Sequence, residues 1–177
     1  DGTVPRPPRP GMRLLFTGVP GACSLWLLGD ILTTCDYSVV CLEGAPGSQF
    51  GGQAVPLGSL RQRLLEIGLW RPEFAQRPAT VPGHLGAERF GLGQRDWESL
   101  AANVDAVVHS GVNMNLARTY QYLHPVNIEG TRQCLRFCCE GRLKPVHYQS
   151  SLAVIDQIFV EDDAAPFKED MEYTSYK

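Results

Sequence analysis

Residues 13–32 read RLLFTGVPGACSLWLLGDIL. Arg13–Thr17 is a short apolar run typical of a buried parallel strand, and the apolar residues that follow Ser24 predict a helix. The turn between them contains Gly18 and Gly21. In α/β folds, a strand that leads through a Gly-rich turn into a helix N-terminus binds the pyrophosphate of a dinucleotide. The turn has the form Gly-x-x-Gly-x-x-Ser, so its third position, Ser24, is not glycine.

The rest of the chain alternates between strand and helix patterns. After the first strand, we expect strands at 37–42, 78–85, 105–109 and 144–151. We expect further helices at 59–68, 94–104 and 126–140, and a Gly- and Pro-rich loop over 43–58. This order predicts an α/β fold with a Rossmann-like, doubly wound parallel sheet.

Length and composition indicate one globular domain. Residues 1–11 are rich in Pro and Arg and are expected to be a linker, which leaves 12–177 as the domain. The net charge of −3 argues against nucleic acid or an anionic membrane as the main partner. No apolar run approaches the ~20 residues of a transmembrane helix, and no signal peptide is recognisable. We therefore expect a cytoplasmic protein.

The six cysteines lie at positions 23, 35, 41, 134, 138 and 139. Cys134 and Cys138 stand four residues apart on a predicted helix, a spacing that could suit a metal. No matching pair of His or Cys accompanies them, so buried, reduced thiols are the better interpretation and no metal site is expected.

Three side chains near the C-terminus have the chemistry of a reductase. Ser151 follows a predicted strand, at the sheet edge where ligands bind in open α/β folds. Tyr173 and Lys177 are four residues apart, which on a helix places the phenol and the ammonium on one face. Hydroxyl groups can polarise a carbonyl oxygen, Tyr can donate a proton, and Lys can lower the Tyr pKa while it holds a ribose.

Several segments together resemble a known family. They are 14–18 (LLFTG), 63–70 (RLLEIGLW), 104–109 (VDAVVH), 126–131 (VNIEGT) and 144–152 (KPVHYQSSL). In this order they resemble the N-terminal half of the thioester reductase domains that end nonribosomal peptide and polyketide synthetases. These domains belong to the extended short-chain dehydrogenase/reductase superfamily.

The resemblance implies NADPH-dependent release of a thioester from a carrier as an aldehyde or an alcohol. An acyl or peptidyl carrier protein and neighbouring synthetase domains would be the partners. Ser151 takes the place of the catalytic Thr or Ser, Tyr173 that of the proton donor and Lys177 that of its partner.

On the cofactor side, the resemblance assigns Gly18, Gly21 and Ser24 to the phosphate turn. Gly44 follows the second strand, where the family has an Arg for the 2′-phosphate of NADPH. At the adenine side, the family's Gly-Asp-Leu is replaced by Gly83-His84-Leu85, and Ser110 follows the strand at 105–109.

The chain departs from the family pattern at several of these cofactor-binding positions. Pro20 removes a backbone N–H from a turn that donates N–H groups, and the side chain of Ser24 is expected to crowd the packing of helix on strand. Glu43 and Gly44 replace a cation with an anion and a neutral residue, which disfavours a phosphate.

Three functions therefore stay open. The first is a truncated, degenerate reductase-like domain that does not bind NADPH and acts as a structural or interaction module; Lys177 ends the chain within the expected helix. The second is an active NADPH-dependent thioester reductase. The third is release of the thioester by cyclisation, for which His109 or His147 would have to act as a base, although a lone His there is more often a core residue.

Overall fold

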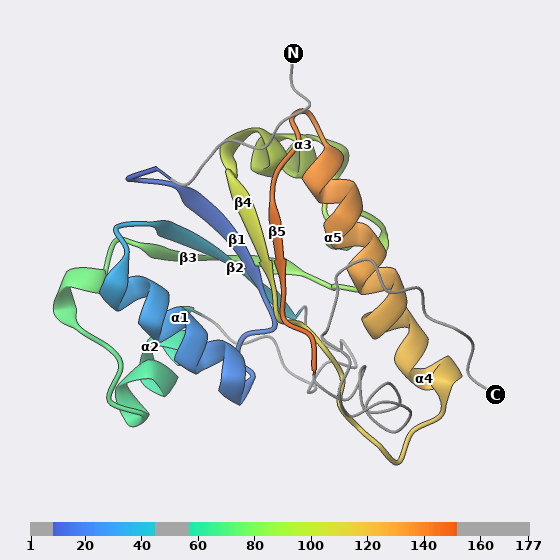
Figure 1. The fold of residues 1–177 in the computed structure, drawn as a ribbon, viewed down its shortest axis with the longest axis horizontal. Helices are drawn as coiled ribbons and strands as arrows, with labels where there is room; N and C mark the ends of the chain where they lie inside the picture. Colours follow the sequence, from blue (N-terminus) through green and yellow to red (C-terminus); the bar gives the residue numbers. More distant parts are fainter. Residues whose placement is uncertain (1–8, 45–56, 152–177) are drawn as a thin grey trace, which may run out of the picture.

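The computed structural model describes residues 9–44 and 57–151, and for residues 57–59 it describes the backbone alone. Five parallel strands form one sheet in the order β3-β2-β1-β4-β5 (Figure 1). The strands are β1 (Arg13–Thr17), β2 (Ser38–Gly44), β3 (Pro78–Gly83), β4 (Ala106–His109) and β5 (Val146–Tyr148). From β1 the chain adds β2 and β3 on one side of the sheet and then returns to add β4 and β5 on the other side. In open α/β sheets, ligands bind at such a switch point, which here lies between β1 and β4.

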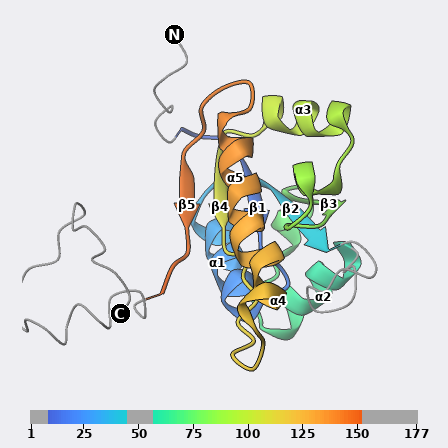
Figure 2. The same cartoon turned by 90° about the vertical axis from the view of Figure 1, so that its right-hand side faces the viewer.

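Helices cover both faces of this sheet. Helices α1 (Ala22–Thr34) and α2 (Leu57–Glu66) lie on one face, and α3 (Gln94–Asn103) and α5 (Gly130–Cys139) lie on the other (Figures 1 and 2). The shorter elements are the 3₁₀ turns η1 (Pro72–Phe74) and η2 (Glu88–Gly91), the helix α4 (Tyr120–His124) and the π-helical turn η3 (Pro125–Glu129). The described part therefore has the predicted doubly wound architecture.

The core consists of two layers, one on each face of the sheet. Toward α1 and α2, Phe16, Leu28 and Leu64 are fully buried. Toward α3 and α5, the rings of Trp97 and Phe137 meet edge to face, with centroids 5.0 Å apart. Consecutive side chains of a strand alternate between these layers because strand periodicity is two.

The strand boundaries correct two expectations. The loop expected over 43–58 is shorter at both ends, because β2 continues through Gly44 and α2 already begins at Leu57. The strand expected over 144–151 shortens to Val146–Tyr148, whose three residues are exposed at the sheet edge.

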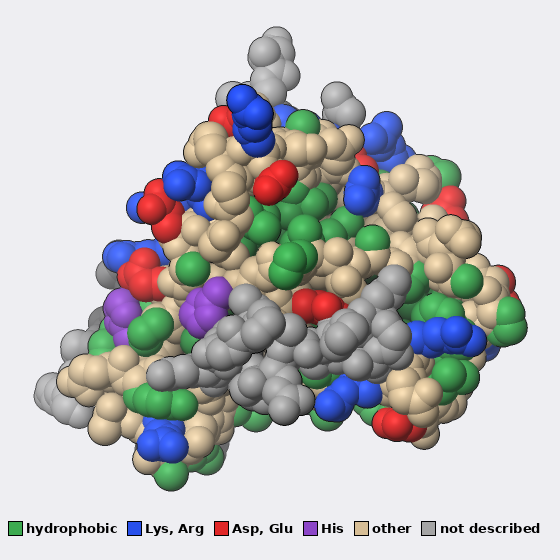
Figure 3. Space-filling model, turned by 180° about the vertical axis from the view of Figure 1, so that it is seen from behind, with side chains coloured by type: hydrophobic (Ala, Val, Ile, Leu, Met, Phe, Trp, Pro, Cys, Tyr) green, Lys and Arg blue, Asp and Glu red, His purple; other side chains and the backbone are tan. Residues whose placement is uncertain are grey.

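The position of β3 at the other edge of the sheet explains why this strand can contain prolines. The strand β3 includes Pro78 and Pro82 and lies at the sheet edge, where a missing N–H costs no ladder hydrogen bond. Figure 3 views the molecule from the side of this edge, where hydrophobic side chains gather in the centre of the surface and charged ones lie around them.

The helix expected over 126–140 begins earlier and is not a single α-helix. It starts at Tyr120, passes through the π-helical turn η3 and ends at Cys139. Two of its apolar positions, Ile128 and Leu135, are exposed, whereas Phe137 and Cys138 are buried. A π-helical turn adds a residue to the helix repeat, so a regular 3.6-residue pattern does not identify its buried face.

Cysteine burial follows the prediction in part. Cys41, Cys134 and Cys138 are buried, whereas Cys23 and Cys139 are exposed. All six are free thiols.

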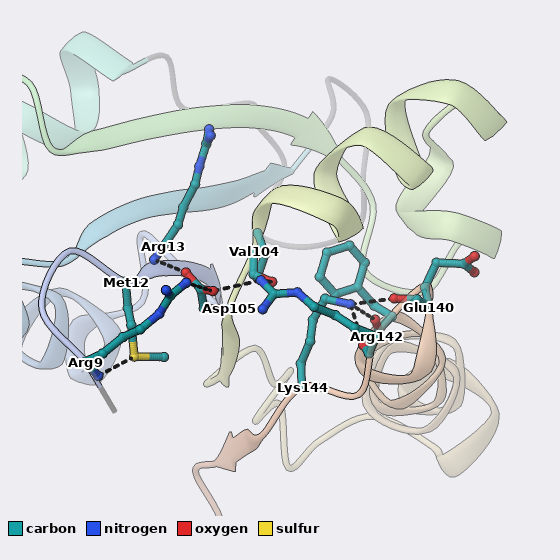
Figure 4. A network of polar contacts seen from close by, with 9 residues as sticks. Arg9, Met12, Arg13, Val104, Asp105, Glu140, Arg142 and Lys144 are labelled. Atoms are coloured by element: carbon teal, nitrogen blue, oxygen red, sulfur yellow. Dashed lines mark hydrogen bonds and ion pairs between the residues drawn. The ribbon is translucent and has the colours of Figure 1, made fainter. Parts of the chain in front are cut away.

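A polar cluster joins three segments at the N-terminal ends of the central strands. The carboxylate of Asp105 accepts hydrogen bonds from the backbone N–H of Arg13 at 2.9 Å and from the guanidinium groups of Arg9 at 3.0 Å and Arg142 at 2.8 Å (Figure 4). These bonds lower the pKa of Asp105 to about 2 against the opposing effect of burial. The cluster lies at the end of the sheet opposite the Gly-rich turn, so it holds the fold rather than a ligand.

Candidate functional site

The Gly-rich turn lies against the loop that follows β4. Gly18 has a φ of +98°, and a Cβ placed on it would lie 2.5 Å from the carbonyl carbon of Ser110, so no other residue fits without a backbone shift. The N–H of Gly21 donates to the carbonyl oxygen of Gly18 at 2.8 Å and closes the turn. No side chain caps the N-terminus of α1. The turn therefore leads into a helix N-terminus that no side chain caps, and such an N-terminus can bind an anion.

Ser24 is buried at the junction between α1 and the sheet. Its Oγ lies 2.8 Å from Oγ of Ser110, and the hydroxyl of Ser110 donates to Oε1 of Gln149. The side chain that we expected to crowd this junction is accommodated there by a hydrogen bond. Sequence reasoning placed Ser24 and Ser110 near the cofactor without predicting their contact, and it missed Gln149, which lies just beyond β5.

His109, at the end of β4, is buried and bonded on both sides. Its Nδ1 lies 2.7 Å from Oγ1 of Thr17, and its Nε2 lies 3.1 Å from Oγ1 of Thr131. The Thr131 hydroxyl donates to the carbonyl oxygen of Asn127, so it must accept from Nε2, and Nδ1 accepts from Thr17. Burial lowers the pKa of His109 to about 4. His109 is thus a neutral structural residue, which argues against its use as an accessible base.

His147, the other histidine considered as a base, is exposed on β5. It borders an apolar groove of about 460 Å³ between α1 and the sheet, together with residues such as Leu27 and Ile31. This groove lies on the α1 face rather than in the loops at the carboxyl ends of the strands. His147 is therefore poorly placed to act on a ligand bound at the Gly-rich turn.

At the end of β2, the strand carries a buried carboxylate. Glu43 is 7% exposed, pairs in register with Pro82 of β3 and bonds the side chain of Thr80. Burial raises the pKa of Glu43, and the Thr80 hydrogen bond opposes this effect. Glu43 and Gly44 are thus part of the strand, whereas the sequence placed them in a loop after it.

The remaining predicted cofactor positions lie, like Glu43, at the carboxyl ends of the strands. Gly44 pairs with Gly83, and the next residue, His84, is half-buried and donates its backbone N–H to the carbonyl oxygen of Phe90 at 2.8 Å. Gly44 and His84 therefore lie at the ends of neighbouring strands.

Of the three predicted catalytic residues, the structure describes one. Ser151 lies three residues beyond the end of β5 and is exposed. Tyr173 and Lys177 lie outside the described residues. The catalytic assignment therefore stays a prediction.

Two asparagines that lie 14 residues apart in the sequence form a reciprocal pair. The N–H of Asn113 donates to Oδ1 of Asn127 at 2.8 Å, and Nδ2 of Asn127 donates to the carbonyl oxygen of Asn113 at 3.1 Å. This pair fixes the loop after β4 on the π-helical turn. Its members appear in the sequence as Val-Asn and Asn-x-x-Gly-Thr, but spacing alone does not reveal that they meet.

Within residues 9–44 and 57–151, no group of three or more His, Cys, Asp or Glu side chains is arranged to hold a metal ion. In the same part of the chain, no helix is long and apolar enough to cross a membrane.

Residues 16–174 match the model of an NAD-binding domain family described as male sterility protein. The chain belongs to this family. Its members include relatives with reductase and synthase names, and the family implies a nicotinamide cofactor.

Two curated relatives illustrate the range of the family. The chain is 32% identical over 142 residues to glycine betaine reductase of Emericella nidulans, covering 80% of this chain and 11% of that protein. It is 33% identical over 157 residues to a linear gramicidin synthase protein of Brevibacillus parabrevis, covering 89% of this chain and 3% of that protein. The chain thus spans a small part of these relatives.

Solved reductase domains share the fold. The terminal R domain of the myxalamid PKS-NRPS pathway superposes with a TM-score of 0.74 at 28% identity, covering 85% of this chain and 38% of that one. An R domain of a nonribosomal peptide synthetase from Mycobacterium tuberculosis gives 0.66 at 26% identity, covering 88% and 37%. The predicted resemblance to the N-terminal part of these reductase domains and the Rossmann-like fold are confirmed.

Proposed function

We propose that this chain is a reductase-like domain of a nonribosomal peptide or polyketide synthetase that does not bind NADPH. In this proposal it acts as a structural or interaction module, with carrier protein and neighbouring synthetase domains as its partners. The observation that carries the proposal is the buried carboxylate of Glu43 at the end of β2, followed by Gly44.

The 2′-phosphate of NADPH does not fit these residues. A phosphate requires cationic or hydrogen-bond donors, and the two positions that end β2 supply a carboxylate and no side chain. Burial strengthens the repulsion between a carboxylate and a phosphate, because the surrounding dielectric is lower than that of water. Pro20 adds to this mismatch, since it has no N–H to donate to the diphosphate.

An active NADPH-dependent thioester reductase is the second candidate. It is favoured by the retained turn, in which Gly18 and Gly21 keep their close approach and α1 starts without a side-chain cap. Ser151 follows β5 in the chain, and the family resemblance assigns it the catalytic hydroxyl of this activity. In that case the chain would release a carrier-bound thioester as an aldehyde or an alcohol.

Cyclising release receives less support. Both ring nitrogens of His109 are engaged inside the core, and His147 lies beside the groove on the α1 face. Neither is positioned as a base at the candidate site.

The deciding experiment is a titration of the 177-residue chain with NADPH, followed by cofactor fluorescence and by thermal shift. We expect no saturable binding in the micromolar range. Gly44→Arg restores the family's cation and is expected to introduce measurable binding, whereas Gly93→Arg adds the same charge at the start of α3 and is expected to have no effect. Saturable micromolar binding of NADPH by the unmodified chain would overturn the proposal.

A further inference from the structure

A polar pocket lies on the face of the sheet that α3 and α5 cover (Figure 2). Its volume is about 350 Å³, which falls within the range of small-ligand sites, ~300–1,000 Å³. The walls come from η2, the first turn of α3 and α5, and include Arg89, Gln94, Gln133, Arg136, Cys139 and Glu140. The pocket shares no lining residue with the candidate site at the Gly-rich turn.

The backbone of η2 is strained where Arg89 borders this pocket. Arg89 and Phe90 have φ angles of +51° and +57°, in the left-handed region that residues other than glycine rarely adopt. The side chain of Phe90 is fully buried, and the N–H of Arg89 donates to Oε1 of the buried Gln133 at 2.9 Å. The core therefore holds the strained residues in place, as is typical of positions that clamp a ligand.

The guanidinium of Arg89 has unused donors. Its Nη1 donates to Glu88 at 3.0 Å, whereas its Nε is buried and has no acceptor among the residues that the structure describes. A buried donor without an acceptor is unfavourable, so its presence in a folded protein requires an explanation. The planar guanidinium can donate two parallel hydrogen bonds to one carboxylate. A carboxylate at the edge formed by Nε and Nη2 would satisfy the unpaired donor.

Arg136 brings a second guanidinium to the pocket. It is exposed, and in the described part of the chain its side chain has no hydrogen bond or ion pair. The two carboxylates of the wall are already engaged, Glu88 with Arg89 and Glu140 with the indole N–H of Trp97 at 3.0 Å. Their negative charges repel a doubly charged phosphate more strongly than a singly charged carboxylate. The free donors and the charge of the wall therefore both favour a carboxylate.

We propose that this pocket binds a ligand through a carboxylate group, with Arg89 and Arg136 as the binding residues. A free small acid and an acidic side chain of a neighbouring polypeptide share this chemistry. The inference goes beyond the proposed function, because the pocket lies outside the Gly-rich turn and its ligand does not depend on NADPH.

Cys139 makes the occupancy of the pocket measurable. It lines the pocket and is exposed, so a bound ligand should shield its thiol. The full chain is labelled with a neutral thiol reagent while glutarate or a tetraglutamate peptide is titrated at constant ionic strength, and peptide mass spectrometry resolves the labelled sites. We expect one of the two acids to slow the labelling of Cys139 roughly fivefold at saturation. The labelling rate of Cys23, which is exposed on α1 and outside the pocket, should not change.

Two variants identify the donors. Arg136→Gln should abolish the protection of Cys139, whereas Arg132→Gln, one turn earlier on α5 and paired with Glu129 at 2.9 Å, should retain it. Arg89→Asn removes the other guanidinium but tolerates a positive φ. It should abolish protection while the melting temperature stays the same or rises, because strain is relieved. A purely structural Arg89 would instead give a lower melting temperature and unchanged protection. Circular dichroism establishes that the variants are folded.

The uncharged analogues glutaramide and tetraglutamine are the ligand controls. Protection by glutarate supports a free acid as the ligand, and protection by the peptide alone supports a polypeptide partner. If neither acid protects Cys139, or if the amides protect it equally well, the inference is wrong. Protection that persists in both Arg136→Gln and Arg89→Asn would also overturn it. These results are independent of the NADPH titration, so the inference and the proposed function can fail separately.

Discussion

The hydroxyl of Thr17 lies 2.7 Å from Nδ1 of His109 and donates to it, which ties the end of β1 to the end of β4 inside the protein. The same hydroxyl accepts a hydrogen bond from the N–H of Gly111 at 3.2 Å. Thr131 of α5 accepts from the other ring nitrogen, and burial keeps the imidazole neutral between the ends of these two strands and α5. This arrangement has a consequence for stability at acid pH.

We expect His109 to destabilise the protein as the pH falls. Its pKa is about 4 in the folded state against 6.5 in the unfolded state, so the unfolded chain binds the extra proton between these values. The free energy of unfolding should therefore fall as the pH drops from about 6.5 to about 4 and level off below, with a loss of about 3 kcal/mol from this group.

Urea unfolding at a series of pH values measures this loss. His109→Gln should flatten the pH dependence in this window, and His147→Gln, at an exposed position, should not. An unchanged slope in His109→Gln would show that other groups, such as carboxylates, cause the acid instability.

Asp105→Asn should destabilise the fold by about 2 kcal/mol at neutral pH. The carboxylate has a pKa of about 2, lowered from 3.8, because it accepts bonds from Arg13, Arg9 and Arg142. Its contribution is complete above the unfolded pKa and is lost as the pH falls through the folded one. The urea midpoint of the variant measures the effect, with Asp30→Asn on the exposed side of α1 as the control. Equal effects of the two changes would contradict this role.

Lys144→Met should destabilise the protein by about 2–3 kcal/mol because it leaves buried carbonyl groups without a donor. The ammonium of Lys144 donates to the carbonyl oxygens of Phe137 at 3.3 Å, Glu140 at 2.6 Å and Arg142 at 3.0 Å, and so caps the C-terminal end of α5 (Figure 4). Arg132→Met on the exposed face of the same helix should cost less than about 1 kcal/mol. Thermal and urea unfolding of the two variants give the comparison.

Gly18→Ala should cost more than about 3 kcal/mol, since it combines a positive φ with a collision against backbone atoms. The matched control is Gly11→Ala, which has a φ of +69° but no heavy atom within 4 Å of the added Cβ. The control should cost about 1 kcal/mol, the strain of the left-handed region alone. Similar losses in the two variants would mean that the contact between Gly18 and Ser110 is not tight in solution.

Thiol reactivity should divide the cysteines by burial. Cys23 and Cys139 are exposed and should react rapidly with a disulfide reagent in the native protein. Burial raises the pKa of Cys41 to about 12 and that of Cys138 to about 11, so these thiols should react only after unfolding. Counting the fast thiols before and after addition of denaturant tests this division, and rapid native labelling of Cys41 would contradict it.

Much of the fold could be read from the sequence because it is encoded locally. The apolar run Arg13–Thr17 and the glycines after it predict the central strand and its turn, since burial on both faces and a tight turn each restrict the residue types. The alternating strand and helix patterns further along the chain extended this to the order of strands and helices. The strand expected over 78–85 contains Pro78 and Pro82, which an edge strand tolerates.

Contacts between distant segments were decided by the tertiary structure. The sequence marked Ser24 as a departure from glycine, but only the packing of α1 beside the loop after β4 gives its hydroxyl a partner in Ser110. Likewise, nothing local in the sequence around His109 indicates that both ring nitrogens are bonded inside the core. Spacing along the chain determines which face of an element is buried, whereas the partner of a polar side chain depends on which elements the sheet brings together. For that reason the turn was recognisable from the sequence alone, and the position of Glu43 beside it followed from the register of β1 and β2.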